Sequence, residues 1–312
     1  MKLIITGGSG QVGRILARAF RGQGDEVVIV SRRAETGDVV WDGKTQQGAW
    51  AHALDGSDVV INLAGRSVDC RYTEENLQQM MSSRVDSTRA VGIAIANAER
   101  PPKVWLQMST ATIYAHRFDA ANDERTGLIG GEEEDAPAYW KRSIDIATAW
   151  EGAQADAKTP HTRKVALRTA MVMSPDRGGV FHVLLGMTRK RLGGSIGGGR
   201  QYVSWIHEQD LVNSIRFLID RDDIDGAVNL ASPTPLPQRE FAADLRAAWG
   251  TRVGLPVTAW MAKLGAVFMR TDTELVLKSR RVVPGRLRDA GFSFAFPTWK
   301  EAAVELVERA RH

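Results

Sequence analysis

The sequence predicts an α/β fold with a doubly wound parallel sheet, followed by a smaller, mostly helical C-terminal domain. Short apolar runs alternate with segments of helical periodicity. The runs show no alternation of apolar and polar residues, as strands covered by helices on both faces require. Four glycines, Gly7, Gly8, Gly10 and Gly13, directly follow the first run. The 312 residues suit about two domains.

Strands and helices alternate along the first 231 residues. The apolar runs expected to form strands are Lys2–Thr6, Glu26–Val30, Asp58–Leu63, Val104–Met108, Lys164–Arg168 and Ala227–Leu230. The segments expected to form helices are 12–20, Glu74–Ala98, Ala138–Ala157 and Glu208–Arg221. Because strands joined in this way form right-handed βαβ units, we expect a parallel sheet with helices on both faces.

A change of composition marks the expected domain boundary. Pro233, Pro235 and Pro237 form a stiff extended connection, and the mostly helical region Arg239–Arg311 follows. We therefore expect one domain at residues 1–231 and a smaller substrate domain at residues 232–312. Residues 170–201, which include a glycine-rich loop, are expected to contribute to the substrate cleft.

The composition excludes several classes of protein. Hydrophobic residues make up 43% and charged residues 25%, which is typical of globular chains. A single cysteine, Cys70, excludes a disulfide framework, and no cluster of His, Asp or Glu has metal-ligand spacing, so we expect no metal. No apolar run approaches the ~20 residues of a membrane span, and no signal peptide opens the chain, which favours the cytoplasm. The net charge is +4 and the arginines are scattered, so we expect no nucleic-acid partner.

The glycine cluster predicts a dinucleotide-binding turn. It reads Gly7-Gly8-Ser9-Gly10-Gln11-Val12-Gly13, between a strand and a helix. The first glycine permits a tight turn, the middle one lets the backbone approach a pyrophosphate, and the last lets helix and strand pack closely. The free N–H groups at the helix N-terminus then bind the phosphates, as in a Rossmann-type domain. We therefore assign Gly7, Gly10, Gln11, Val12 and Gly13 to the cofactor.

The end of the second strand favours NADP over NAD. An NAD site places an acid there to bind the ribose hydroxyls. This strand instead ends in Val30-Ser31-Arg32-Arg33. A hydroxyl and a guanidinium suit a 2′-phosphate, so we assign Ser31 and Arg32 to NADP.

The motif spacing and several other stretches resemble the extended short-chain dehydrogenases/reductases. Asn62-Leu63-Ala64-Gly65 and the segment from Met108 to Tyr114 are similar to that family's fourth- and fifth-strand motifs. The sequence resembles an atypical, nucleoside-diphosphate-sugar epimerase-like subfamily more closely. The stretches that carry this second resemblance are Ser83-Arg84-Val85, Trp150-Glu151, LGGSIGGGRQYVSWIH at 192–207 and RVVPGRLRDAGF at 281–292.

The resemblance implies further cofactor residues, namely Asn62, Leu63, Ala64, Arg84 and Ser109. Arg168 joins them because it ends a strand at the carboxyl edge of the sheet, where ligands bind.

The family's catalytic pair is not intact in this sequence. Extended reductases use a Ser or Thr at the end of strand 5, matched here by Thr110, and a Tyr and a Lys four residues apart on the next helix. Tyr139 is followed four residues later by Ser143, and an alignment on Glu151 places Ser143 and Ala147 at the two positions. Thr110 and Tyr139 remain the catalytic candidates, the latter as a proton donor.

Gln201, Trp205 and His207 follow the glycine-rich loop and are the candidate substrate residues. Two hypotheses remain. The first is an NADP-dependent oxidoreductase or epimerase that acts on a small polar substrate, with a nucleotide-linked one left open. The second is a non-catalytic NADP-binding sensor or scaffold that has lost the Tyr–Lys pair. In either case we expect a monomer or homodimer.

Overall fold

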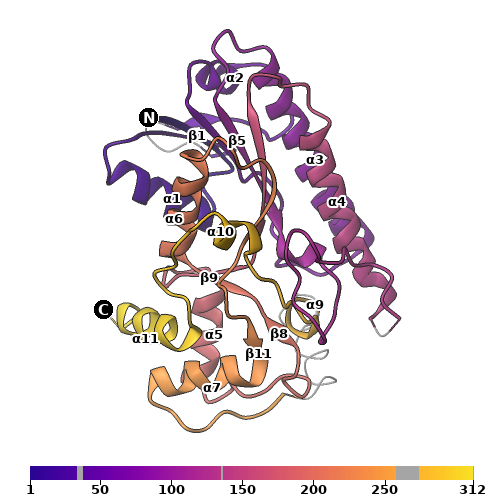
Figure 1. The fold of residues 1–312 in the computed structure, drawn as a ribbon, viewed down its shortest axis with the longest axis vertical. Helices are drawn as coiled ribbons and strands as arrows, with labels where there is room; N and C mark the ends of the chain where they lie inside the picture. Colours follow the sequence, from indigo (N-terminus) through magenta and orange to yellow (C-terminus); the bar gives the residue numbers. More distant parts are fainter. Residues whose placement is uncertain (34–37, 135, 258–273, 312) are drawn as a thin grey trace.

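A parallel sheet of seven strands forms the centre of the structure (Figure 1), a computed structural model that describes residues 1–33, 38–134, 136–257 and 274–311. In chain order the strands are β1 (Lys2–Thr6), β2 (Glu26–Ser31), β3 (Val39–Val40), β4 (Val59–Asn62), β5 (Val104–Thr110), β6 (Arg163–Thr169) and β10 (Gly226–Leu230). Their spatial order is β10-β6-β5-β4-β1-β2-β3. The order reverses between β1 and β4, and this switch point is where α/β sheets bind ligands. The predicted doubly wound fold is confirmed.

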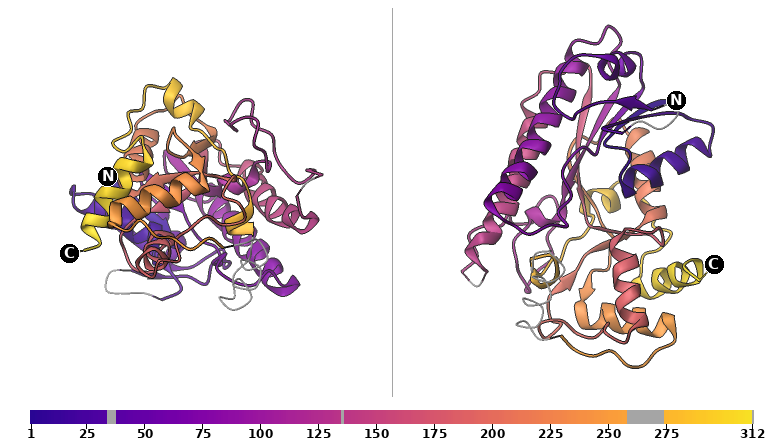
Figure 2. Two further views of the ribbon diagram at one scale, coloured as in Figure 1. Left: turned by 90° about the horizontal axis from the view of Figure 1, so that it is seen from below. Right: turned by 180° about the vertical axis from the view of Figure 1, so that it is seen from behind.

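Helices cover both faces of the sheet, as Figures 1 and 2 show. On one face lie α1 (Gln11–Arg21) and α6 (Glu208–Ile219). On the other lie α2 (Ala49–Leu54), α3 (Glu74–Ala96) and α4 (Lys141–Ala155). The short 3₁₀ helices η1 (Ala111–Ile113) and η2 (Ala138–Trp140) precede α4 and complete this side of the sheet. The four long helices occupy the predicted segments to within a few residues.

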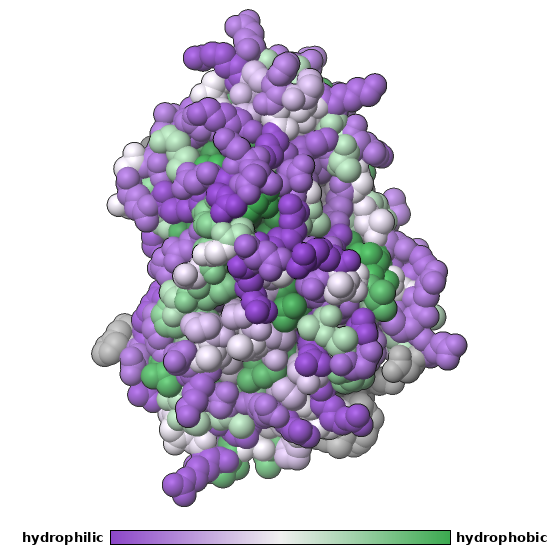
Figure 3. Space-filling view, in the orientation of Figure 1, coloured by the Kyte–Doolittle hydropathy of each residue, from purple (hydrophilic) through white to green (hydrophobic). Residues whose placement is uncertain are grey.

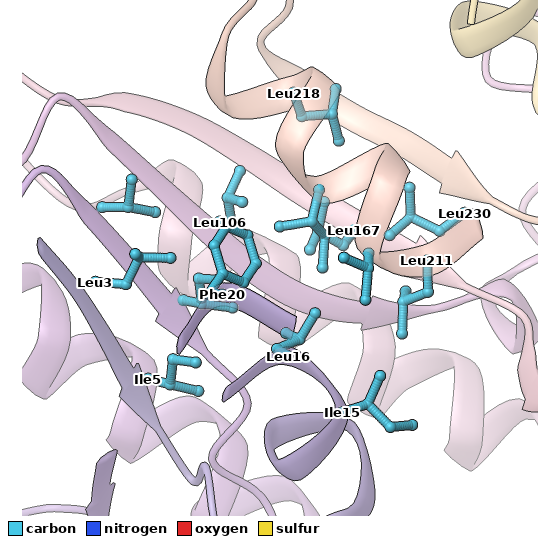
Figure 4. Close-up of a cluster of buried hydrophobic side chains, with 14 of the residues drawn as sticks. Leu3, Ile5, Ile15, Leu16, Phe20, Leu106, Leu167, Leu211, Leu218 and Leu230 are labelled. Atoms are coloured by element: carbon cyan, nitrogen blue, oxygen red, sulfur yellow. The ribbon is translucent and has the colours of Figure 1, made fainter. Parts of the chain in front are cut away.

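The alternation of side chains along each strand explains why the runs are apolar throughout. Leu3 and Ile5 of β1 point toward α1 and α6, whereas Ile4 points toward α2 and α3. Figure 4 shows the first of these two cores. Its labelled residues are Leu3, Ile5, Ile15, Leu16, Phe20, Leu106, Leu167, Leu211, Leu218 and Leu230. Most apolar residues of the central strands are therefore buried on one face or the other.

A smaller unit lies below the sheet in Figure 1. The elements outside the main sheet and its helices are β7 (Met171–Met173), α5 (Val180–Arg189), β8 (Tyr202–Val203), β9 (Trp205–His207), β11 (Leu236–Pro237), α7 (Gln238–Trp249), α9 (Glu274–Leu277), α10 (Gly285–Asp289) and α11 (Trp299–Arg309). The helical structure expected at residues 258–273 falls outside the described residues.

The core of this smaller unit joins two stretches of chain that are separated by α6 and β10. Trp299 of α11 stacks on Phe241 of α7, with ring centroids 3.9 Å apart. Trp205 of β9 packs edge-on against Trp299 at 5.1 Å. Residues of segment 173–205 therefore share one core with residues of 241–307.

Ion pairs connect the smaller unit to the helix behind the glycine turn. Arg18 of α1 contacts Asp176 at 3.0 Å and Glu208, the first residue of α6, at 3.4 Å. Arg309 of α11 pairs with the same Glu208 and with Glu305. Because the Glu208 side chain is 7% exposed, these contacts fix α1, α6 and α11 relative to one another.

The surface in the orientation of Figure 3 is largely hydrophilic, with hydrophobic side chains in small, separate areas. None of the helices that the structure describes is long and apolar enough to cross a membrane.

We expect Gly13→Ala to destabilise the protein because α1 approaches the glycine turn too closely for a side chain. A Cβ on Gly13 would lie 2.2 Å from the carbonyl oxygen of Gly8. Overpacking of this kind costs about 1–3 kcal/mol, which thermal denaturation would record as a Tm lowered by several degrees. The matched control is Gly152→Ala on α4, where a Cβ meets no atom within 4 Å. This control should raise the stability by about 0.4–1 kcal/mol. Equal effects of the two changes would contradict the argument.

Candidate functional site

The glycine turn leaves its backbone open to a ligand. Gly7 has φ +71°, and a Cβ there would lie 2.7 Å from the Ala64 backbone, so only glycine fits. Gly10 precedes α1 without a side-chain cap, and a Cβ on Gly10 would meet only the Gly7 carbonyl oxygen, at 3.6 Å. The first N–H groups of α1 are therefore available to an anion.

A cavity of about 320 Å³ lies at this turn, on the carboxyl edge of the sheet. Its lining residues are Gly7, Gly10, Gln11, Val12, Gly13, Leu63, Met108, Ser109, Thr169, Ala170 and Val172. Seven of these are predicted cofactor residues, and Met108, Thr169, Ala170 and Val172 were not predicted. The Gln11 side-chain nitrogen is buried and has no hydrogen-bond partner among the described residues. An unsatisfied donor beside an open glycine backbone suits the phosphates of a dinucleotide.

Asn62 and Ala64 support the turn. The buried Asn62 amide oxygen accepts hydrogen bonds from the Thr6 hydroxyl at 2.6 Å and the Ala64 N–H at 3.0 Å. Its amide nitrogen donates to the Gln107 side chain at 3.0 Å. Asn62 therefore ties β1, β4 and β5 together and sets Ala64 against Gly7. The structure gives it a positioning role below the cavity.

Ser31 and Arg32 lie at the end of β2. The buried Ser31 hydroxyl donates to the carbonyl oxygen of Arg33 at 2.5 Å and so fixes the turn, while both arginines are exposed. Asp38, the next described acid along the chain, is paired with Arg21 at 4.0 Å. The described residues thus place positive charge, and no acid, directly at the strand end.

A partly buried ion pair organises the ends of β5 and β6. Arg168 donates two hydrogen bonds to the Glu151 carboxylate of α4, at 2.9 and 2.8 Å, and one to the Tyr114 hydroxyl at 2.9 Å. Ser109 also donates to Glu151, at 2.5 Å. Burial lowers the pKa of Arg168, but the bonds to Glu151 outweigh it, so the pKa lies above its usual value. Arg168 and Ser109, both assigned to the cofactor, are therefore held by Glu151, for which the sequence suggested no role.

A second cavity of about 100 Å³ adjoins the end of β5 and contains two more of the predicted residues, Thr110 and Arg84. Its lining residues are Val68, Tyr72, Met80, Arg84, Thr110, Thr112, Ser143, Ile146, Ala147 and Trp150. The spacing of 143, 146, 147 and 150 is one face of α4. The Thr110 hydroxyl oxygen accepts the Thr112 N–H at 3.1 Å, which leaves its proton for donation.

Arg84 is buried rather than solvated. Its side chain donates to the Met80 carbonyl oxygen at 3.1 Å and lies over the Trp150 ring, 4.9 Å from the centroid. Burial lowers the pKa of Arg84 to about 10. The guanidinium therefore forms one wall of the second cavity, beside the aromatic ring.

The remaining predicted residues line neither cavity. Tyr139 on η2 is 43% exposed. The Gln201 side chain donates to the carbonyl oxygens of Ile196 and Val276, at 2.9 and 3.0 Å. Trp205 is buried in the core of the smaller unit. His207 caps α6 by accepting the Gln209 N–H at 3.1 Å, and its other ring nitrogen lies 2.9 Å from Glu305.

Two ionisable side chains that sequence reasoning missed lie behind the second cavity. Ser143 donates to the Glu274 carboxylate at 2.6 Å, and Lys278 lies 3.6 Å from the other oxygen of Glu274. Glu274 is on α9, 131 residues from Ser143, so no local pattern could reveal the contact. Across the described residues, no group of three or more His, Cys, Asp or Glu side chains could hold a metal ion.

Residues 3–231 match the sequence model of the NAD dependent epimerase/dehydratase family, and residues 257–306 match a domain of unknown function, DUF1731. The human epimerase family protein SDR39U1 is 30% identical, and the alignment covers 98% of this chain and 100% of the human protein. Epimerase family protein SERP0438 of Staphylococcus epidermidis is 29% identical over 98% of this chain and 99% of its own length.

Solved structures show the same relationship. The crystal structure of human SDR39U1 isoform 2 with NADPH superposes with a TM-score of 0.87 at 29% identity, covering 99% of both chains. A nucleoside-diphosphate sugar epimerase from Corynebacterium glutamicum gives 0.76 at 26% identity, covering 99% of this chain and 58% of that one. A UDP-N-acetylglucosamine 4-epimerase from Bacillus cereus, at 16% identity and a TM-score of 0.75, shares the fold. Together with the cavity at the glycine turn, these matches show that the chain belongs to the NAD-dependent epimerase/dehydratase family.

Proposed function

We propose that the protein is an NADP-dependent oxidoreductase or epimerase-like enzyme that acts on a small polar substrate. The observation that carries the proposal is the position of two consecutive residues at the end of β5. Ser109 lines the cavity at the glycine turn, and Thr110 lines the smaller cavity beside it. A cofactor in the first cavity and a substrate in the second would therefore meet at one strand end.

The cofactor is NADP. The turn from Gly7 to Gly13, with Gln11, would hold the pyrophosphate, and Ser31 and Arg32 would hold the 2′-phosphate. The human relative of 29% identity was crystallised with NADPH, which supports this choice. When bound, the cofactor supplies or accepts a hydride at the nicotinamide ring.

The substrate carries a carbonyl or hydroxyl group on a small body. The second cavity, of about 100 Å³, presents the hydroxyls of Thr110, Thr112 and Ser143 among apolar side chains. Thr110 would donate its hydroxyl proton to the substrate oxygen and so polarise it. A nucleotide-linked substrate would extend beyond this cavity. The partner is thus a small molecule, and a monomer or homodimer suffices because one chain builds both cavities.

A non-catalytic NADP-binding sensor or scaffold is the second candidate. It is favoured by the loss of the Tyr–Lys pair: Ala147 lines the second cavity, and Tyr139 lies outside it. The two candidates share the cofactor and differ in whether the nicotinamide reacts.

The first expected outcome concerns cofactor choice. NADP⁺ should bind at least about tenfold more tightly than NAD⁺, because a charge-assisted hydrogen bond to the 2′-phosphate contributes about 1.5–3 kcal/mol. Calorimetric titration of both nucleotides measures this preference. Arg32→Asp should weaken NADP⁺ binding and spare NAD⁺, whereas Arg252→Asp, the same charge change at an exposed residue after α7, should leave both unchanged. Equal affinities in the unmodified protein would refute the assignment.

The second expected outcome separates enzyme from sensor. The protein is incubated with NADPH and a panel of small carbonyl compounds (propanal, methylglyoxal, acetoin and 2-oxobutyrate), and the loss of NADPH absorbance is followed. An enzyme reduces at least one of them. Thr110→Ala should then lower kcat/KM about 10²–10³-fold, as loss of one oxyanion donor does. Tyr139→Phe should not change it. Tight NADPH binding without any turnover would favour the sensor.

A further inference from the structure

A buried carboxylate and a buried amine stand behind the second cavity, in contact with one of the hydroxyls that line it. From this arrangement we infer that Ser143 exchanges the proton with the substrate oxygen, and that Glu274 and Lys278 are positioning residues that act through it. The inference rests on the proposed function and supplies the proton path that the missing Tyr–Lys pair leaves open.

Of Ser143, Glu274 and Lys278, only Ser143 lines the second cavity and could contact the substrate. It lies in the first turn of α4 and lines the second cavity together with Thr110 and Thr112. Its hydroxyl donates to a Glu274 oxygen at 2.6 Å. A serine hydroxyl that touches both a cavity and a carboxylate can take a proton on one side and give one up on the other.

Glu274 and Lys278 form a pair that is closed to solvent. Each side chain is 1% exposed, and the Lys278 ammonium lies 3.6 Å from the second Glu274 oxygen. The ammonium also donates to the carbonyl oxygen of Thr112 at 2.9 Å. Removing two charges from water is unfavourable unless the pair is well bonded, and apolar side chains could fill this space equally well. The chain instead keeps an acid and an amine against the cavity wall.

The other charged groups around the pair keep it in place and set its protonation. Arg280 donates to the Glu274 backbone carbonyl at 3.2 Å and to the Thr112 hydroxyl at 3.1 Å. The charge of Glu133 raises the pKa of Lys278, and that of Tyr72 raises the pKa of Arg280. His116 accepts the N–H of Ser279, the residue after Lys278, at 2.7 Å. Burial lowers the pKa of Lys278 to about 8, against the opposing effect of Glu274, while Arg280 lowers it further. Lys278 can therefore gain and lose a proton near neutral pH.

Reduction of a carbonyl consumes one hydride and one proton. A bound cofactor would supply a hydride to the carbonyl carbon, and the electron pair of the C=O π bond would form a new O–H bond with the Ser143 proton. For this, Lys278 first passes a proton to the Glu274 carboxylate, and the resulting carboxyl group donates to Ser143 Oγ as Ser143 gives its own proton to the substrate oxygen. After the alcohol leaves, a proton from water in the second cavity returns to the amine along Ser143 and Glu274, because the pair itself is closed to solvent. The net reaction is carbonyl, NADPH and one proton to alcohol and NADP⁺, and alcohol oxidation runs the same transfers in reverse.

The experiment uses the full-length protein, NADPH and the carbonyl panel named above. Ser143→Ala should lower kcat/KM about 10²–10⁴-fold, as loss of a positioned proton donor does. NADPH affinity by calorimetry should not change, because Ser143 lies outside the first cavity. Thr148→Ala, which removes an exposed hydroxyl from the same helix, is the matched control and should keep full activity.

The pH profile tests Lys278 and Glu274. Reduction requires the Lys278 ammonium, whose pKa is lowered to about 8, so kcat/KM should be level below that pH and fall about tenfold per unit above it. Oxidation of the product alcohol by NADP⁺ requires the amine and should show the opposite slope. Lys278→Arg keeps the charge but cannot release the proton, so both rates should fall and both slopes should disappear. Glu274→Gln should lower both rates, and Tm is recorded for every variant. If Glu274→Gln does not fold, the Ser143→Ala and Lys278→Arg results still show whether the relay operates.

The outcomes separate this inference from the proposed function. Turnover by the unmodified protein with full activity in Ser143→Ala overturns the relay and leaves the proposed function standing. An unchanged pH profile in Lys278→Arg removes Lys278 from the path, and unchanged rates in a folded Glu274→Gln variant remove Glu274. No turnover of any probe, with NADPH still bound, overturns both.

Discussion

The paired hydrogen bonds between Glu151 and Arg168 hold together the part of the molecule on which both cavities depend. Glu151 belongs to α4, Arg168 to β6, and the Ser109 hydroxyl that also reaches Glu151 belongs to β5. One carboxylate thus fastens a helix to the ends of two strands. Both ionic side chains are less than one fifth exposed, at 13% and 16%, so the attraction is only weakly screened. Breaking such a pair by removing one partner usually destabilises a protein by about 3–5 kcal/mol.

This attachment fixes the geometry on either side of β5. Ser109 and the glycine turn form the walls of the larger cavity, while Thr110, one residue later, faces the smaller cavity together with Ser143, two turns before Glu151 on α4. A small rotation of α4 would move Ser143 and Ala147 away from the strand end. The positions of Thr110 and Ser143 therefore depend on a salt bridge whose two side chains line neither cavity. The stack of Arg84 on Trp150 holds the same helix from the side of α3.

The features that could be predicted from sequence are those encoded within one short segment. The glycine turn needs only Gly7 to Gly13, and the apolar runs and helical periodicities fixed the main sheet. Thr110 followed from the resemblance of its segment to the fifth-strand motif of the extended reductases. By contrast, β3, β7, β8, β9 and β11 have two or three residues each, too few to show a period. The contacts of Glu151 with Arg168 and of Ser143 with Glu274 join distant segments, and only the packed fold brings these together.

Residue type alone was a weak guide where burial decides the role. His207 could exchange protons, but it caps α6 and contacts Glu305. Gln201 could bind a substrate, but its amide donates to two backbone carbonyls. Tyr139 was a candidate because it is the tyrosine at the start of α4, yet a 3₁₀ turn leaves it 43% exposed. Arg84 shows the opposite case: a charged residue on a long helix, where such residues are usually solvated, is buried against the Trp150 ring.

The shared core of Trp205, Phe241 and Trp299 has a consequence for how the chain is made. Trp205 and Phe181 leave the ribosome well before their partners on α7 and α11. While the N-terminal sheet can already close around α1, α3 and α6, the apolar face of segment 173–205 stays uncovered until about one hundred further residues have been synthesised (residue 307 is the last of that core). During this interval the apolar side chains of segment 173–205 have no partners to cover them, and exposed apolar surface of this kind makes a nascent chain prone to aggregation.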